Sequence, residues 1–292
     1  MKLAAIVREG SSPLNEFVKI EVALADAVER LTPVSESPRL DAELLLARAL
    51  DVPRSYLFAH PEDELDSAAV KRFSTTIESR TKGAPLAYIT GEKEFWSMTL
   101  MVTRDTLVPR PETEILVDQV LVRIPKREAM KVLDLGTGSG AIALAIAKER
   151  PICDVTATDF SAAALAIAKE NARQHSLPNI EFLLGDWLEP VAGQMFDIIA
   201  TNPPYVPSED PDLERLQHEP LTALASGADG LDAIRRIAVD ATSVIKPGGS
   251  LLIEHGDEQH AAVAEILQEA GWKEIGVTND LAGIPRVTTA VR

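Results

Sequence analysis

The chain has 292 residues, 46% of them hydrophobic and 25% charged, which is typical of a globular protein long enough for two domains. Its 45 acidic and 29 basic residues give a net charge of −16, so most of its surface would repel an extended nucleic acid. No apolar run approaches the roughly 20 residues that span a bilayer, and the first residues lack a signal-peptide core. We therefore expect a cytoplasmic monomer that contacts neither a membrane nor a nucleic acid directly.

The first part of the chain, residues 1–90, is expected to be a small helical domain. Apolar residues between Leu40 and Leu50 recur at helical spacing directly after Ser37-Pro38, which is a typical helix start. No segment of this part has the alternating period of a strand. Two further helices are expected, over residues 16–31 and 68–82.

A β-hairpin is expected to link this domain to the rest of the chain, within residues 91–115. Between Glu92 and Val108 the apolar residues alternate in part, as they do in a strand with one buried face. Arg104-Asp105 is the predicted turn. The hairpin therefore marks a change from a helical to a mixed architecture.

The remaining residues, 116–292, alternate between strand and helix patterns. Such alternation implies parallel strands joined by right-handed crossovers, and hence a doubly wound α/β sheet. The last two strands are joined by too few residues for a crossover, so the final strand should be antiparallel. Strands are expected over residues 131–135, 153–158, 180–184, 196–201, 250–254, 273–278 and 287–291, and helices over residues 141–148, 162–174, 231–245 and 258–270.

A glycine-rich turn follows the first of these strands. Gly136, Thr137, Gly138, Ser139 and Gly140 lead from the strand into a helix, and glycines there allow a sharp bend and close approach of a ligand. The spacing also satisfies the dinucleotide-binding pattern, in which a third small residue follows two glycines. This turn alone therefore predicts a nucleotide-type ligand without deciding which one.

Acidic residues at the ends of the next two strands fit an adenosine. Asp159 lies where an acid meets ribose hydroxyls in such sheets, and a carboxylate can accept from two vicinal hydroxyls. Asp186 and Trp187 follow the third strand, where they can accept from an exocyclic amine and contact a ring. The alternatives are a helix N-terminal role for Asp159 and a core position for Trp187. The set fits S-adenosylmethionine at least as well as a dinucleotide, and no metal site is predicted.

The tetrapeptide Asn202-Pro203-Pro204-Tyr205 follows the fourth strand, outside its carboxyl end. Successive prolines donate no backbone hydrogen bond and hold the chain extended, so the Asn202 side-chain oxygen and the Pro203 carbonyl remain available as acceptors. Two acceptors can hold both N–H groups of a planar NH₂, and Tyr205 can pack on its flat face. We predict methyl transfer to such a nitrogen, with Asn202, Pro203 and Tyr205 catalytic and Pro204 in the substrate site.

These residues resemble the HemK-type protein-(glutamine-N5) methyltransferases, which act on peptide chain release factors. The resemblance runs from Asp41 to Val291 and is strongest in the run Val108-Pro109-Arg110-Pro111-Glu112-Thr113-Glu114, which is close to the signature that precedes the catalytic domain of this family. Further agreements lie at residues 40–47, 85–91, 94–96, 219–220, 227–232, 254–256 and 282–286.

The resemblance implies a Rossmann-like class I S-adenosylmethionine-dependent methyltransferase with seven strands. It implies that residues 136–140, Asp159, Trp187 and Asn202 bind the cofactor. Residues 202–205 would hold a glutamine in the Gly-Gly-Gln loop of class I release factors, the proteins that act in translation termination. The helical domain would recognise the release factor.

The resemblance also implies that Phe95 and Arg110 line the cofactor cleft. For Arg110 the alternative is an ion pair with Glu112 at the domain junction. His218 departs from the aromatic residue that is frequent in the family. Residues 1–16 have no counterpart there, and we expect them to be a flexible start.

Two other enzyme classes remain to be weighed against this interpretation. The tetrapeptide is shared with adenine-N6 and guanine-N2 methyltransferases, so a DNA or RNA base methyltransferase is the alternative, but the chain shows no basic cluster for such a substrate. A dinucleotide-dependent oxidoreductase would have no use for the tetrapeptide. The choice of glutamine rests on the resemblance and not on the tetrapeptide.

Overall fold

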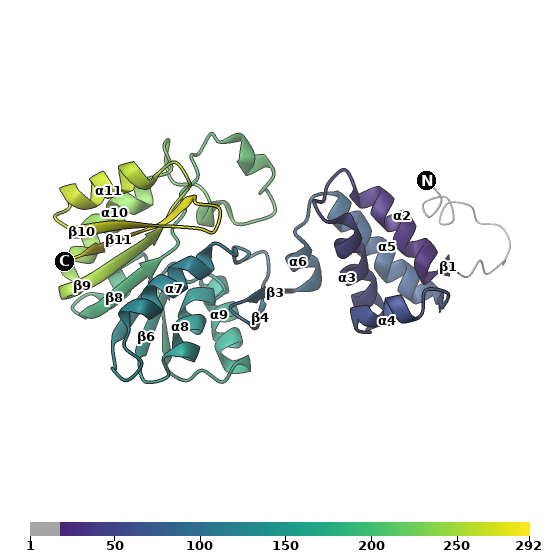
Figure 1. The fold of residues 1–292 in the computed structure, drawn as a ribbon, viewed down its shortest axis with the longest axis horizontal. Coiled ribbons are helices and arrows are strands. Elements are labelled where there is room, and N and C mark those ends of the chain that lie inside the picture. Colours follow the sequence, from purple (N-terminus) through teal and green to yellow (C-terminus); the bar gives the residue numbers. More distant parts are fainter. Residues whose placement is uncertain (1–17) are drawn as a thin grey trace. The chain divides into compact units, whose positions relative to one another are not determined.

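The structure, a computed structural model, describes residues 18–292 and divides into two compact units, one ending at Thr90 and the other beginning at Gly91. Each unit has its own hydrophobic core. Figure 1 shows the helices and strands of both units. The prediction of a flexible start at residues 1–16 lies outside the described residues. Within the described part, no helix combines the length and the apolar character needed to cross a bilayer.

The first unit is helical, as predicted, and its helices enclose a core that includes Leu24, Leu45 and Phe73. Pro38 begins one helix, because its fixed φ suits a first turn. The structure adds two short helices, α4 and α6, and a pair of two-residue strands, all too short to show a period in the sequence. The elements are β1 (Val18–Lys19), α2 (Ile20–Leu31), α3 (Pro38–Leu50), α4 (Arg54–Ala59), β2 (Glu64–Leu65), α5 (Ser67–Thr81) and α6 (Leu86–Thr90).

The second unit contains a seven-stranded sheet in the order β10-β11-β9-β8-β5-β6-β7. β11 runs antiparallel to both of its neighbours, β9 and β10, whereas the other strand pairs of this sheet are parallel. This confirms the predicted doubly wound sheet with an antiparallel last strand. The strands are β5 (Lys131–Leu135), β6 (Asp154–Asp159), β7 (Ile180–Leu184), β8 (Phe196–Thr201), β9 (Ile245–Glu254), β10 (Lys273–Asn279) and β11 (Pro285–Val291).

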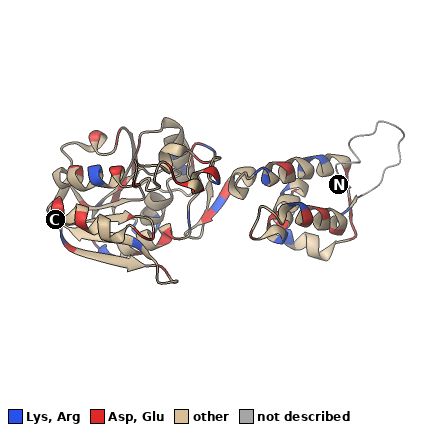
Figure 2. Cartoon of the chain, turned by 90° about the horizontal axis from the view of Figure 1, so that it is seen from above, with Lys and Arg blue, Asp and Glu red and all other residues tan. Residues whose placement is uncertain are grey.

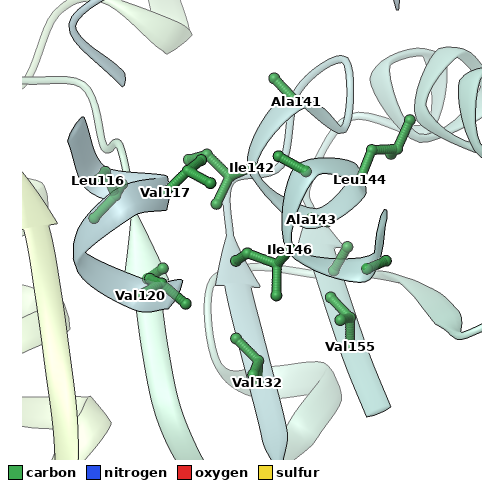
Figure 3. Packing of buried hydrophobic residues seen from close by; sticks show 14 of the residues in the cluster. Leu116, Val117, Val120, Val132, Ala141, Ile142, Ala143, Leu144, Ile146 and Val155 are labelled. Carbon is green, nitrogen blue, oxygen red and sulfur yellow. The ribbon is translucent and has the colours of Figure 1, made fainter. Parts of the chain in front are cut away.

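Helices cover both faces of this sheet (Figure 1). Val132 of β5 packs under α8 together with Val155 of β6 (Figure 3), whereas Leu133 and Leu135 belong to the core on the opposite face. This alternation buries both faces of a parallel strand. The helices are α7 (Thr113–Arg123), which was not predicted, α8 (Ala141–Glu149), α9 (Ala162–Gln174), α10 (Asp232–Asp240) and α11 (His260–Glu269).

The hairpin is present, and its strands are joined at Trp96-Ser97. The predicted turn at Arg104-Asp105 also forms, with the Thr106 N–H donating to the Thr103 carbonyl at 3.1 Å, but it lies beyond the second strand of the hairpin. β3 (Glu92–Phe95) pairs with β4 (Met98–Met101), and the two residues between them, Trp96 and Ser97, have φ values of 51° and 52°. Two-residue turns with positive φ normally carry Asn or Gly, so Trp-Ser gives no turn signal. The Trp96 N–H donates to Glu114 at 2.8 Å, which holds the turn against α7.

The hairpin is joined to the glycine-rich turn by one buried side chain, that of Asn171 in α9. Its Oδ1 accepts from the Met101 N–H at 2.7 Å, and its Nδ2 donates to the carbonyls of Met101 and Ser139 at 3.0 and 2.9 Å. Asn171 is fully buried, so no water can replace these partners. One amide therefore satisfies backbone groups of strand β4 and of the glycine-rich turn.

We expect Asn171→Leu to lower the free energy of unfolding by about 3 kcal/mol, because it leaves buried backbone groups without partners at nearly constant side-chain volume. Urea unfolding measures this loss. The matched control is Gln174→Leu on the exposed face of the same helix, which should change stability by less than about 0.5 kcal/mol. Equal losses in the two variants would contradict the assignment.

Candidate active site

Two cavities meet at the carboxyl ends of the central strands. The first, of about 550 Å³, is lined by Gly136, Asp159, Trp187 and Asn202 among others. The second, of about 430 Å³, is lined by Arg110, Asn202 and residues that follow it. Ligands of doubly wound sheets bind in this position. Asn202 is in the wall of both cavities, so it is placed to contact two ligands at once.

The glycine-rich turn contributes only part of itself to the first cavity. Gly136 and Gly138 are in the cavity wall, whereas Thr137 and Ser139 are buried and Gly140 is packed against α8. A Cβ at Gly140 would lie 2.5 Å from Cδ1 of Leu144, and its φ of 89° also favours glycine. Thr137, Ser139 and Gly140 therefore shape the turn from behind the wall.

Asp134, at the end of β5, fixes the turn from below. Its Oδ2 accepts from the Thr137 hydroxyl at 2.6 Å and from the Ala143 N–H at 3.1 Å. Burial raises the pKa of Asp134 to about 7, and these hydrogen bonds oppose the shift in part. The carboxyl thus joins the strand, the turn and the first residues of α8.

Asp159, at the end of β6, faces the first cavity. Its two oxygens accept from the N–H groups of Gly138 and Ser161 at 2.9 and 2.8 Å. Each oxygen of a carboxylate has a second lone pair, so the group keeps acceptor capacity toward the cavity. Burial raises the pKa of Asp159. Ser161, and not Asp159, is the N-cap of α9, because its Oγ accepts from the Ala164 N–H.

Asp186 and Trp187 are also in the wall of the first cavity. Asp186 forms an ion pair with Arg236 at 2.7 Å, a partner that the sequence did not suggest. Trp187 packs partly against the core, and its carbonyl accepts from the Thr158 hydroxyl at 3.2 Å. The Trp187 side chain therefore lines the cavity, as predicted, and also packs against the core, which was the alternative.

The side-chain amide of Asn202 is held by two neighbours. Its Nδ2 donates to Oε1 of Glu254 at 2.9 Å and to Oγ1 of Thr113 at 3.1 Å. Its Oδ1 accepts no hydrogen bond from residues 18–292, and neither does the backbone carbonyl of Pro203. The two oxygens predicted to hold the N–H groups of a planar NH₂ therefore have no hydrogen-bond partner among the described residues.

Glu254, the last residue of β9, is 2% exposed. Burial raises its pKa to about 7, nearby Glu112 adds to the rise, and the Thr113 and Asn202 side chains and Arg286 oppose it. Thr201 of β8 pairs with Ile253 of β9, so the next residues along the chain, Asn202 and Glu254, lie side by side. Parallel register therefore places a buried carboxyl next to the Asn202 amide.

The rest of the tetrapeptide lies beside Asn202. Pro203 is buried, Pro204 is in the wall of the first cavity, and Tyr205 is in the wall of the second. Burial, with a smaller effect of Glu254, raises the pKa of Tyr205, so its hydroxyl stays protonated. The Tyr205 carbonyl accepts from the Gln259 side chain at 2.9 Å, which holds the loop in place.

Two residues carried over from the family resemblance have other positions. Phe95 is 1% exposed within the core and does not line the first cavity. Arg110 is in the wall of the second cavity, and it pairs with Glu219 at 2.5 Å rather than with Glu112. Glu219 also accepts from the Val108 N–H at 3.0 Å. This pair ties the segment before α7 to the loop that follows the tetrapeptide.

The sequence did not single out Thr113, Asn171 or Glu254 as contributors to the site. Glu254 carried one signal, because an acid at the carboxyl end of a parallel strand next to β8 lies at the ligand-binding edge of the sheet. Thr113 and Asn171 come from helices whose approach to the strand ends depends on tertiary packing. Thr113 lies in the run 108–114 that carries the family resemblance, but no local pattern gave it or Asn171 a role in the site.

Residues 126–280 match a family described as Methyltransferase domain, and residues 22–91 match one described as PrmC N-terminal domain. A solved methyltransferase from Pyrococcus furiosus has a TM-score of 0.52 at 18% identity, over 66% of this chain and 88% of that protein. The family match over more than half of the chain, together with this fold, identifies a methyltransferase of the S-adenosylmethionine-dependent type.

Sequence relatives narrow the class. A release factor glutamine methyltransferase of Coxiella burnetii is 48% identical over 94% of this chain and 100% of its own length. One of Xylella fastidiosa strain Temecula1 is 47% identical over 91% of this chain and 95% of its own length. The chain belongs to the release factor glutamine methyltransferase family.

The buried Glu254 carboxyl predicts a pH dependence of stability. Its pKa is about 7 in the folded chain against 4.5 ordinarily, so the folded state holds the proton more tightly. Stability from this group is complete below about pH 4.5 and falls as the pH rises through about 7, by about 3 kcal/mol in all.

The variant Glu254→Gln removes this titration and keeps a side chain that can accept from Asn202. We expect its free energy of unfolding to match that of the parent near pH 5 and to exceed it by about 3 kcal/mol near pH 8. Urea unfolding at both values measures the difference. Asp134 titrates in both proteins, so its contribution cancels in the difference between their free energies of unfolding. A difference that does not change with pH would show that Glu254 is already ionised near pH 5.

Proposed function

We propose that this protein transfers a methyl group from S-adenosylmethionine to the side-chain amide nitrogen of the glutamine in the Gly-Gly-Gln loop of class I peptide chain release factors, in the cytoplasm. The observation that carries the proposal is the position of Asn202, which lines both cavities and whose Oδ1 accepts no hydrogen bond from the described residues. Membership of the release factor glutamine methyltransferase family supports the choice of substrate.

The first cavity suits S-adenosylmethionine. Its volume of about 550 Å³ is in the range of cofactor sites, and its walls combine glycine backbone, a carboxylate and an aromatic ring. Asp159 would accept from the ribose hydroxyls, and Asp186 and Trp187 would flank the adenine. Gly136 and Gly138 allow close approach of the ligand to the backbone. When bound there, the cofactor supplies an activated methyl group on a sulfonium, which is its own leaving group.

The second cavity suits the glutamine side chain. Oδ1 of Asn202 and the Pro203 carbonyl would each accept one N–H of the substrate amide, which fixes its plane. Tyr205, with its protonated hydroxyl, lines the same cavity. An amide nitrogen is a weak nucleophile because its lone pair is delocalised. Acceptors on both N–H groups favour the positive charge that grows on nitrogen as the methyl arrives.

The protein therefore acts mainly by alignment. Holding the nitrogen about 3–3.5 Å from the methyl carbon, in line with the sulfur, lowers the entropic part of the barrier. No strong base is required in the rate-limiting step, because the proton can leave after transfer. The described site accordingly offers hydrogen-bond acceptors toward the substrate nitrogen.

The charge distribution favours a protein substrate over a nucleic acid. Acidic residues are spread over both units among the basic ones (Figure 2), and arginines of the second unit such as Arg173, Arg235 and Arg236 form ion pairs with carboxylates. The neighbouring carboxylates lower the positive potential that a phosphate would meet at these arginines. We propose that residues 1–90 contribute to recognition of the release factor, and that the enzyme is a monomer.

Labelled S-adenosylmethionine tests the substrate directly. We expect transfer to a class I release factor, none to its loop variant with Ala in place of the glutamine, and none to duplex DNA. Label on DNA but not on the release factor would overturn the proposal and support a base methyltransferase. Label on the loop variant would place the methyl group elsewhere on the release factor.

Asn202→Ala removes the side-chain acceptor and should lower the transfer rate at saturating substrate by about 100- to 1,000-fold, the usual effect of removing one group that stabilises developing charge. Binding of S-adenosylmethionine, measured by calorimetry, should weaken far less, because Gly136, Asp159 and Trp187 remain. The control is Asn179→Ala, distant from both cavities. Near-normal turnover of Asn202→Ala would show that the Asn202 side chain does not hold the substrate amide as proposed.

A further inference from the structure

We infer that Glu254 is a positioning residue, which fixes the Asn202 amide so that its oxygen, and not its nitrogen, faces the substrate amide. The inference rests on the proposed function, because it concerns the group that would hold the glutamine nitrogen. It names a residue that the family resemblance and the sequence analysis left without a role.

The geometry gives the Asn202 amide one orientation. Both N–H groups of Nδ2 are engaged, with Oε1 of Glu254 at 2.9 Å and Oγ1 of Thr113 at 3.1 Å. Glu254 and Thr113 are 2% and 4% exposed, so neither partner is replaced by bulk water. The remaining atom, Oδ1, is left to the cavities. A flipped amide would present N–H donors to a substrate that itself offers N–H donors.

Glu254 decides this orientation and Thr113 does not. A hydroxyl can donate or accept, so Thr113 pairs equally well with either end of an amide. An ionised carboxylate only accepts, so it pairs with Nδ2 and repels Oδ1. A protonated carboxyl has a donor as well, and it then tolerates both orientations. The selection therefore depends on the charge of Glu254.

The same charge strengthens the acceptor that the substrate meets. Hydrogen bonds in a chain polarise one another, more so where the surroundings exclude water. A carboxylate that accepts from Nδ2 draws the amide toward its charge-separated form and makes Oδ1 more negative. A more negative Oδ1 stabilises the positive charge that grows on the substrate nitrogen. Glu254 thus acts on the reaction through Asn202, without contact with the substrate.

The surroundings of Glu254 set the pH at which this happens. Burial and Glu112 raise its pKa to about 7, against the opposing effects of Thr113, Arg286 and Asn202, and Tyr205 also lies within its field. A primary amide and a sulfonium do not titrate near neutral pH. Neither reacting group therefore gives a change of the methyl-transfer rate in this range. The rate should rise as Glu254 ionises, and the variant without this carboxyl identifies the titrating group.

The variant Glu254→Gln tests the role at constant shape. A glutamine amide offers a donor or an acceptor, so it no longer selects the orientation of Asn202. At pH 8 we expect the transfer rate at saturating substrates to fall by about tenfold or more. The affinity for S-adenosylmethionine, measured by calorimetry, should be unchanged, because Glu254 does not line the first cavity. The control is Glu265→Gln, exposed on α11, which should leave the rate unchanged.

The pH profile separates positioning from a structural role. In the parent protein the rate should rise with a midpoint near pH 7, and in Glu254→Gln this rise should vanish. A flat profile in the parent protein overturns the inference. A midpoint near 7 that survives in Glu254→Gln also overturns it, because a group other than Glu254 would then control the rate.

Different results would refute the proposed methyl transfer and the positioning role of Glu254. If the parent protein transfers no methyl group to the release factor at any pH, the proposed function is wrong, and the inference falls with it. If the parent protein transfers the group and Glu254→Gln matches it at every pH, the proposed function stands and the role of Glu254 is refuted. A rate loss without a change in the fold or in cofactor affinity supports both.

Discussion

Parallel register at the centre of the sheet is the constraint on which the site depends. β5 pairs with β6 on one side and with β8 on the other, and β8 pairs with β9, all in parallel. Parallel strands end at the same edge, so residues far apart in the chain come to lie next to one another there. Asp159, Asn202 and Glu254 each follow or end a different strand, and no local contact would bring them together.

That edge is also where the chain buries charge. Asp134 and Glu254 are both nearly inaccessible, and burial raises the pKa of each to about 7. A buried carboxyl costs stability unless hydrogen bonds offset the loss of water, and here they do so only in part. Each of the two carboxyls orders a neighbouring segment, the glycine-rich turn in one case and the Asn202 amide in the other. The same two buried carboxyls therefore cost stability and order the site.

Much of the architecture could be predicted because it follows from local patterns. The alternation of strands and helices after residue 130 gave the doubly wound sheet, and the short connection before β11 gave the antiparallel last strand. The wall of the first cavity includes Asp159, Asp186, Trp187 and Asn202. Their positions could be predicted because the ends of strands can be located from the sequence. Features that depend on tertiary contacts could not be found in this way.

Three such features illustrate the limit. The Trp96-Ser97 turn is held by Glu114 of α7, so its positive φ values have no local signature. Thr137 and Ser139 belong to the glycine-rich run, yet which of its residues face the cavity depends on Asp134 and Asn171 beneath it. α3 also contains an apolar residue, Leu40, that is exposed while Asp41 beside it is buried, because Asp41 pairs with Arg80 of α5.

The buried amide of Asn171 has a consequence for dissecting the protein into fragments. A catalytic fragment that began at residue 116 would omit Met101, which supplies the Asn171 side chain with two of its three partners. It would also remove Phe95 and Leu100 from the core that supports α8. The hairpin is therefore part of the catalytic module, and expression of that module alone should begin at Gly91, where the second compact unit starts.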